Sequence, residues 1–160
     1  MIDIIGTVIN VKISETETFE YDYTNLKEVW SYAAENVEHI SVKLDEDKLC
    51  IAMNAEKGQT GIVVVIDIKT GSILNWFEAP YAICATQNEN MIYSLSLVTQ
   101  WGKEPYNYIN TYNTHTKVLD TLDFPYEGEY GQNAMLHYDD GELIIEEGID
   151  NVVFVTLEGW

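Results

Sequence analysis

The sequence predicts a mainly β protein of the α+β class, an antiparallel meander or sandwich with one helix near the N-terminus. Two observations lead to this prediction. Short apolar segments recur along the chain, separated by turns rich in Gly, Asn and Asp. Apolar residues at helical spacing form one stripe, within residues 25–37. A chain of 160 residues that is 46% hydrophobic fits a single domain, residues 1–160, with a substantial core.

The N-terminal segments are predicted as strand, strand and helix. Residues 2–13 and 19–23 alternate apolar and polar side chains, as half-buried strands do. Residues 25–37 carry the apolar stripe, and Asn25 followed by Glu28 fits a capping box at its start. We expect this stripe to pack into the core rather than to form a binding groove. Its residues are Leu26, Val29, Trp30, Ala33 and Val37.

Residues 41–160 are predicted as a β-meander that follows the strand–helix segment of residues 1–40. Residues 48–53 and 61–68 are apolar on both faces, which is typical of central strands. Further strands are expected at close spacing along the rest of the chain. They are residues 72–77, 81–85, 91–98, 106–112, 117–122, 135–138, 142–147 and 151–156.

A weak internal repeat runs through the meander. The segments LDEDKLCIAMN, TQNENMIYSLS and YDDGELIIEEG each place an acidic or amide-rich turn before a strand, which begins near Lys48, Met91 or Glu142. With the turn at residues 67–71, these units resemble the blades of a β-propeller. Three units are too few for a closed ring of 4–8 blades. The resemblance therefore implies an open, blade-like β-meander.

Negative charge is concentrated toward the C-terminal end. The chain has 27 Asp and Glu residues against 8 Lys, and its net charge is −19. Up to Lys117 there are 16 acids and 8 lysines, whereas the remainder has 11 acids and no base. Solubility, a solvated strand face or a halophilic origin would each account for this, and so would a face that meets a positive partner. Direct binding to nucleic acid is not expected, because it requires clustered cations.

The sequence carries no motif for catalysis, cofactor binding or metal binding. The three histidines are isolated, and there is no nucleophile elbow, Walker loop or dinucleotide fingerprint. The acidic segments at residues 45–47 and 139–142 lack EF-hand spacing and are expected to be hairpin turns. We expect no enzyme activity, no cofactor and no metal. A pair of converging carboxylates, as in a glycosidase, stays open as an alternative.

The two cysteines and the apolar runs predict a reduced, non-membrane environment. Cys50 and Cys84 lie in apolar segments and are expected to be buried and reduced, with a disulfide between them as the alternative. The longest apolar run, residues 62–66, is too short to span a membrane, and no signal peptide is recognisable. We expect a cytoplasmic protein without membrane contact.

Acidic and aromatic residues together predict a protein-binding surface, because carboxylates pair with a partner's Lys and Arg while aromatic rings supply buried area. Trp101 lies in the loop 99–107 and is either an interface anchor or folded back on the sheet. Trp160 is likewise an anchor or a core residue. The predicted partner-binding residues are Trp101, Tyr106, Tyr126, Glu127, Glu129, Tyr130, Asp139, Asp140, Glu142, Glu146 and Glu147.

In overall character, as a small, acidic, cysteine-poor domain without motifs, the chain resembles the immunity proteins of bacterial polymorphic and contact-dependent toxin systems. The resemblance involves no shared motif. It implies an inhibitor that binds a basic, nuclease-type toxin and blocks its phosphate-binding cleft. The alternatives are a DNA mimic or regulatory module that binds a DNA-binding protein, or a small β-fold ligand-binding protein or hydrolase using Trp76 and Trp101. Pairing of two copies through an edge strand, as a homodimer, also stays open.

Overall fold

The computed structural model describes residues 1–123 and 130–157, apart from the Asp123 side chain. These residues form fourteen strands and two short 3-10 helices. The elements are β1 (Ile2–Ile5), β2 (Val8–Lys12), β3 (Thr18–Asp22), η1 (Tyr23–Glu28), η2 (Ser31–Ala34), β4 (His39–Asp45), β5 (Lys48–Ala55), β6 (Thr60–Asp67), β7 (Ile73–Glu78), β8 (Ala82–Asn88), β9 (Met91–Val98), β10 (Tyr106–Asn113), β11 (Leu119–Asp123), β12 (Met135–Asp139), β13 (Glu142–Glu147) and β14 (Asn151–Thr156).

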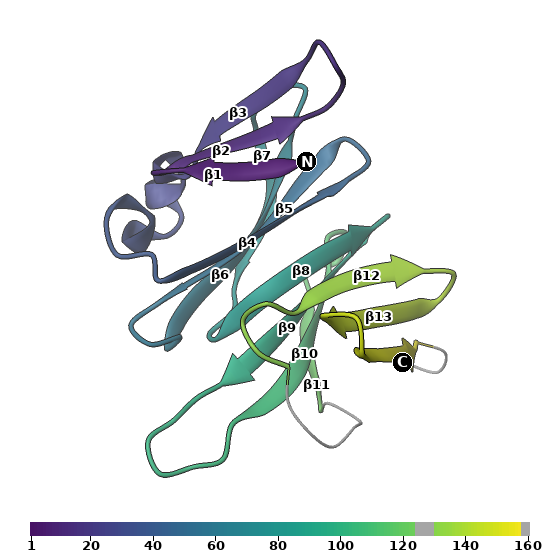
Figure 1. Cartoon of the computed structure of the whole chain (residues 1–160). Coiled ribbons are helices and arrows are strands. Elements are labelled where there is room, and N and C mark those ends of the chain that lie inside the picture. Colours follow the sequence, from purple (N-terminus) through teal and green to yellow (C-terminus); the bar gives the residue numbers. More distant parts are fainter. Residues whose placement is uncertain (124–129, 158–160) are drawn as a thin grey trace.

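The strands form four antiparallel sheets that follow one another along the chain (Figure 1). The first sheet is β1–β3, the second is β4–β7, the third is β8–β11 and the last is β12–β14. Within each sheet every strand pairs with its neighbour in sequence, so each sheet is a simple meander. The predicted mainly β, antiparallel class is therefore confirmed.

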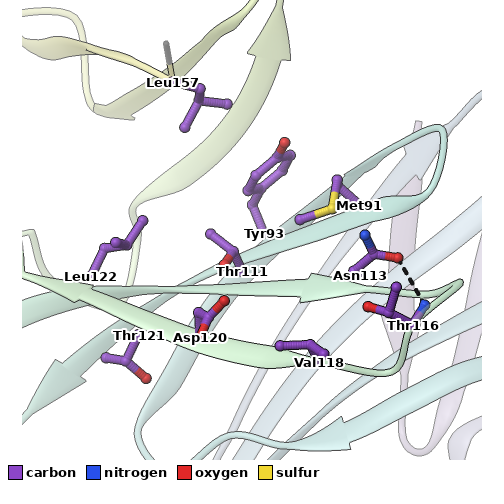
Figure 2. Close-up of a pocket in the computed structure, with 10 residues that line it drawn as sticks. All are labelled: Met91, Tyr93, Thr111, Asn113, Thr116, Val118, Asp120, Thr121, Leu122 and Leu157. Atoms are coloured by element: carbon purple, nitrogen blue, oxygen red, sulfur yellow. Dashed lines mark hydrogen bonds between the residues drawn. The ribbon is translucent and has the colours of Figure 1, made fainter. Parts of the chain in front are cut away.

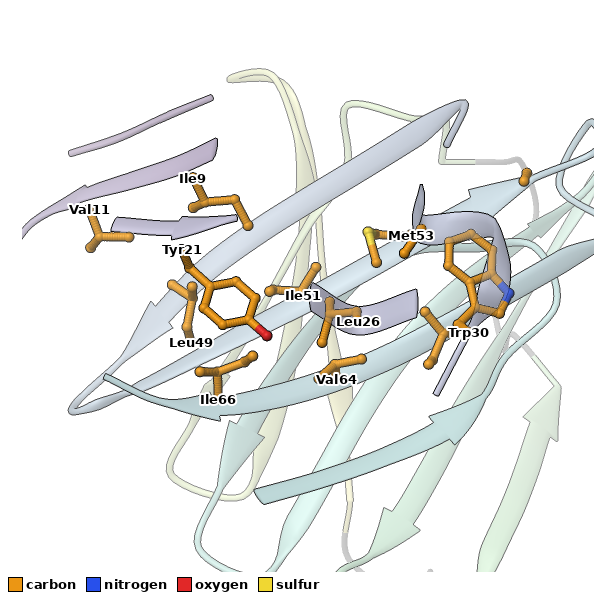
Figure 3. Close-up of a cluster of buried hydrophobic side chains, with 13 residues drawn as sticks. Ile9, Val11, Tyr21, Leu26, Trp30, Leu49, Ile51, Met53, Val64 and Ile66 are labelled. Atoms are coloured by element: carbon orange, nitrogen blue, oxygen red, sulfur yellow. The ribbon is translucent and has the colours of Figure 1, made fainter. Parts of the chain in front are cut away.

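The central strands of the second sheet, β5 and β6, are buried on both faces. Successive side chains of a strand point to opposite faces, and both sets are apolar on β5. Leu49 and Ile51 belong to the core shared with the first sheet, whereas Cys50 and Ala52 belong to the core shared with the third sheet. Figure 3 shows the first of these cores, in which side chains from the first sheet, the helical segment and the second sheet meet.

The third sheet also has two buried faces, and the last sheet covers the second of them. Leu95 and Ile109 of the third sheet form a core with Leu136 and Ile145 of the last sheet. The last sheet thus buries one face against its neighbour. Its opposite face carries side chains that are substantially exposed, such as Phe154.

The first strands of the second, third and last sheets lie next to each other, β4 against β8 and β8 against β12. The sheets therefore spread from these strands in the manner of blades (Figure 1). Each unit of the sequence repeat is the hairpin between the first and second strands of one sheet. The turns are Glu46–Asp47, Glu89–Asn90 and Asp140–Gly141, and each begins at a residue with positive φ.

Two strand predictions need correction. Residues 2–13 are not one strand but two, β1 and β2, because Gly6 adopts φ +62° and turns the chain back on itself. The strand β4 at residues 39–45 was not predicted. It alternates apolar side chains toward the first core with polar ones, such as Ser41 and Lys43, toward the neighbouring sheets.

The predicted helix at residues 25–37 is wrong in form but right in its buried face. Two 3-10 helices replace it, separated by Trp30, whose extended backbone (φ −151°, ψ 101°) interrupts any continuous helix. The Trp30 indole donates to Thr60 Oγ1 at 3.0 Å, a contact that holds it in place. The N-cap is Asp22, whose carboxylate accepts from the Thr24 backbone amide at 3.0 Å, and not Asn25. The stripe residues Leu26, Trp30 and Ala33 are buried, as predicted.

Candidate protein-binding face

The outer face of the last sheet carries most of the acidic side chains that were predicted to bind a partner and that the structure describes. Directly opposed residues of antiparallel strands share a face. Asp139 and Glu142 are opposed, with Thr156 beyond them, and Glu146 lies four residues further along β13 on the same face. Asp140 occupies the tip of the same hairpin, with φ 45°. The backbone register therefore gathers these four carboxylates at one surface.

Apolar side chains occupy the centre of this surface. Ile144 is opposed to Phe154, and Glu146 is opposed to Val152, so all of them stand on the outer face. Phe154 is 53% exposed and Val152 is 38% exposed. We call this surface the acidic face, and it consists of Asp139, Glu142, Ile144, Glu146, Val152 and Phe154. An apolar centre bordered by charged groups is the usual anatomy of a protein interface.

The acidic face carries no Lys or Arg, and the basic side chain beside it is that of His137. Residues 118–160 contain no Lys or Arg. The His137 Nε2 atom lies 2.8 Å from Glu146 Oε1, and both side chains are more than a third exposed. Glu142 and Asp139 have no ion-pair partner among the described residues. The face therefore presents a net negative potential to solvent.

Glu147 and Tyr130, two residues predicted from the acidic C-terminal stretch, do not lie on the acidic face. Glu147 points the other way and accepts a hydrogen bond from the Gly131 backbone amide at 3.2 Å. Tyr130 is only 3% exposed and packs in the core between the third and last sheets. Burial, and then the charge of Glu147, raise the pKa of the Tyr130 hydroxyl. Tyr130 is therefore a core residue and not a surface residue, which corrects its prediction, whereas Glu147 is partly exposed away from the acidic face and its role in binding stays a prediction.

The predicted aromatic residues of the long loop lie elsewhere. Trp101 is fully exposed in the connection between β9 and β10, so it does not fold back on the sheet. Tyr106 is exposed at the start of β10. Both belong to the third sheet and not to the acidic face, and their role as anchors stays a prediction. Tyr126, Glu127, Glu129 and Trp160 lie outside the described residues.

The apolar half of the acidic face was not predicted from the sequence. Ile144, Val152 and Phe154 were treated only as parts of strands. The signal was present in β14, whose sequence NVVFVT has apolar residues at both alternate positions although the strand lies at the edge of its sheet. An edge strand that is apolar on both faces indicates a second contact surface.

The acidic segment at residues 45–47 has a structural role. Asp45 accepts hydrogen bonds from Thr86 Oγ1 and the Gln87 backbone amide, both at 3.1 Å, and its carboxylate lies 2.6 Å from Lys43 Nζ. These contacts tie β4 to β8.

In residues 1–123 and 130–157, no group of three or more His, Cys, Asp or Glu side chains is arranged to hold a metal ion. Both acidic segments form hairpin turns, as predicted.

Both cysteines are buried and free, as predicted. Burial raises the pKa of the Cys84 thiol to about 12. Burial also raises the pKa of Cys50 well above its usual range, with the Asp45 charge as a second cause. Since the thiolate is the reactive form, neither residue is suited to be a nucleophile.

A groove lies on the third sheet beside the end of the last sheet and has a volume of about 600 Å³ (Figure 2). Its lining includes one carboxylate, Asp120, and one aromatic ring, Tyr93, but neither Trp76 nor Trp101. The two tryptophans therefore do not form a ligand site with this groove.

Among the described helices, none has the length and apolar character that a membrane crossing would need.

Comparison with known proteins places the chain in no family. No family model and no curated protein matches the sequence. The chain is similar in structure to the uncharacterized protein lmo1340 from Listeria monocytogenes, with a TM-score of 0.44 and 12% sequence identity. The match covers 97% of this chain and 49% of that one, so the chain spans about half the length of that protein.

Proposed function

We propose that this protein binds a cationic protein partner through the acidic face and thereby inhibits it. The observation that supports the proposal most directly is the composition of that face. It combines exposed apolar side chains, which supply buried area, with carboxylates and no Lys or Arg. A solvated strand face would have little use for an exposed Phe154 opposite Ile144.

The charge distribution fits such a role in kinetics as well as in affinity. A negative face attracts a basic partner during diffusion and can raise association rates toward about 10⁸–10⁹ M⁻¹s⁻¹ at low salt. The apolar centre then contributes to slow dissociation, because its surface is removed from water. A basic cleft that normally binds phosphates is the natural target, since the carboxylates would take the place of the phosphate groups.

The partner we propose is a nuclease-type toxin, and the protein would then be its cytoplasmic immunity protein. This assignment follows the overall resemblance of the sequence to immunity proteins. A DNA-mimic role against a host DNA-binding protein uses the same surface chemistry. The two roles differ in the partner and are separated by the binding experiment below.

The test is a binding titration against a panel of basic nuclease domains and basic DNA-binding domains, with nuclease activity as a second readout. The decisive variant combines Asp139→Asn, Glu142→Gln and Glu146→Gln. The matched control combines Glu15→Gln, Glu17→Gln and Glu20→Gln. It removes the same charge from exposed residues of the first sheet and its turn.

We expect the acidic-face variant to bind at least about tenfold more weakly than the unchanged protein, with a smaller salt dependence. The control variant should bind within about threefold of the unchanged protein. Equal losses for the two variants would show that only the overall charge matters, and the proposal would then fail. Binding confined to DNA-binding domains would assign the DNA-mimic role instead of the immunity role.

A further inference from the structure

Among the described strands, the last sheet has one strand fewer than the sheet on which it packs. The third sheet has four strands, in the order β11-β10-β9-β8, whereas the last has three, β12-β13-β14. The strand β12 lies against β8, so the two sheets are aligned from their first strands outward. The last sheet reaches β11, the fourth strand of the third sheet, only in part: Leu122 packs against the shared core, whereas Asp120 on the same face is exposed.

The 600 Å³ groove occupies this partly covered region. Tyr93, Thr111 and Asp120 are directly opposed on β9, β10 and β11, and they form one row across its floor. Leu122 stands on the same face of β11, and Leu157, which follows β14, lies across the groove from it (Figure 2). The groove is thus bounded by the floor of the third sheet and by the end of the last sheet.

The strand beside the groove has one open edge. Among the described strands, β14 pairs only with β13. In an antiparallel strand, alternate residues direct their backbone N–H and C=O groups to opposite sides. The side of β14 away from β13 is therefore a template for another strand. Val155 of β14 packs in the same core as Ile109 of β10, which places this edge near the partly covered strand β11.

We propose that an extended segment of the cationic partner binds as a fourth strand of the last sheet, paired with β14 and covering the groove above β11. This inference rests on the proposed function and gives the form of recognition. Among the described strands, the second and third sheets have four strands each and the first and last have three, so the last sheet can take a further strand at its open edge. Strand addition supplies affinity through backbone hydrogen bonds, and the alternate side chains supply specificity.

The chemistry of the two faces specifies the sequence of the segment. One set of alternate side chains would face the groove, where Leu122 and Leu157 favour apolar residues. The Asp120 carboxylate has no hydrogen-bond or ion-pair partner within the described part of the chain, so it favours a Lys or Arg in this row. The other set would extend the acidic face beside Val152, Phe154 and Thr156 of β14. Basic side chains long enough to reach Glu142 and Glu146 on the next strand, β13, would fit there. A strand that alternates basic and apolar residues therefore fits the site.

The test uses the heptapeptide amide Lys-Val-Lys-Val-Lys-Val-Lys as the probe. One derivative carries N-methyl groups on the backbone nitrogens of the three valines. The other carries them on the backbone nitrogens of the second, third and fourth lysines. Because alternate amides point to opposite edges, only one derivative blocks pairing with β14. We expect that derivative to bind at least about tenfold more weakly, while the other retains the affinity of the parent. Equal affinity of both derivatives would overturn strand addition.

Amide hydrogen exchange locates the bound strand. We expect the parent peptide to protect amides of β14, and the variant Thr111→Phe, which fills the groove, to remove that protection. Asp120→Lys should weaken binding more than Glu15→Lys, which makes the same charge change on the turn between β2 and β3. Equal effects of these two substitutions would overturn the assignment of the groove.

The outcomes separate this inference from the proposed function. Salt-dependent binding that is lost in the acidic-face variant, without protection of β14, leaves the function in place and overturns strand addition. Protection of β14 that rises with protein concentration in the absence of peptide identifies a second copy as the added strand, and it overturns the partner segment.

Discussion

The third sheet and the last sheet are built in the same way and used differently. Each begins with a strand near the centre of the molecule and continues as a meander. The third sheet has a neighbour on both faces, and its alternate positions are apolar or small on both sides. The last sheet has a neighbour on one face, and its other face mixes carboxylates with exposed Phe154 and Val152.

This difference separates the source of stability from the surface for recognition. Burial of apolar area on both faces of the middle sheets supplies the main driving force for folding. The outer face of the last sheet contributes little to that force, because its side chains keep much of their contact with water. Changes to the middle sheets should therefore alter stability, and changes to the acidic face should alter binding.

The largest expected effect comes from a cavity in the second sheet. Ile51→Ala removes a fully buried side chain from β5 and should lower the free energy of unfolding by about 4 kcal/mol. The corresponding change on the acidic face, Phe154→Ala, should lower it by about 0.5 kcal/mol. Urea denaturation of both variants measures the contrast. Similar losses would show that the outer face of the last sheet is part of the core.

A close approach of two backbones gives the next largest effect. Gly61 on β6 has no room for a side chain, because a Cβ atom there would overlap the backbone oxygen of Ala79. Gly61→Ala should therefore cost about 3 kcal/mol in thermal or urea unfolding. Gly71→Ala is the control, since open space surrounds it and only its φ of +73° is unfavourable for alanine. That control should cost about 1 kcal/mol.

Alkaline pH should lower the stability of the protein, because the Cys84 thiol is buried in the third sheet. The folded-state pKa of Cys84 is about 12, against an ordinary value of 9.0. Between these values the unfolded chain has lost the proton that the folded chain retains, so stability falls as pH rises above 9. One such group contributes a slope of about 1.4 kcal/mol per pH unit. Unfolding titrations from pH 8 to 11 should show a shallower decline for Cys84→Ala than for the unchanged protein.

The strand pattern of this fold was largely readable from the sequence, because burial imposes period-two alternation. The units beginning at Lys48, Met91 and Glu142 are the second strands of three successive sheets. The alternation of Ile40, Val42 and Leu44 in β4 was equally visible, and it was missed beside the stronger apolar runs. What sequence alone could not give is the stacking order of the sheets, since that depends on contacts between distant segments.

The predictions that were wrong for single segments or residues failed because tertiary contacts override the local sequence pattern. The stripe at residues 25–37 has helical spacing, but the hydrogen bond from Trp30 to Thr60 fixes an extended residue in its middle. Tyr130 and Glu147 lie in an acidic stretch, yet the register of the last sheet directs Glu147 away from the acidic face, and Tyr130 packs in the core. Composition locates an acidic region, whereas the register decides which of its members reach the surface.

The smallest expected effect on stability gives the sharpest test of whether stability and recognition depend on different residues of the last sheet. Glu146 pairs with His137 at 2.8 Å, but both side chains are more than a third exposed, and ion pairs in such settings contribute about 0–1 kcal/mol. Glu146→Gln should therefore change the free energy of unfolding by about 0.5 kcal/mol or less, while it measurably weakens binding of a cationic partner. Glu20→Gln, an exposed acid of the first sheet, should leave both quantities nearly unchanged. If Glu146→Gln lowered stability by about 2 kcal/mol instead, its carboxylate would hold the sheet together, and the separation of stability from recognition would no longer apply to the last sheet.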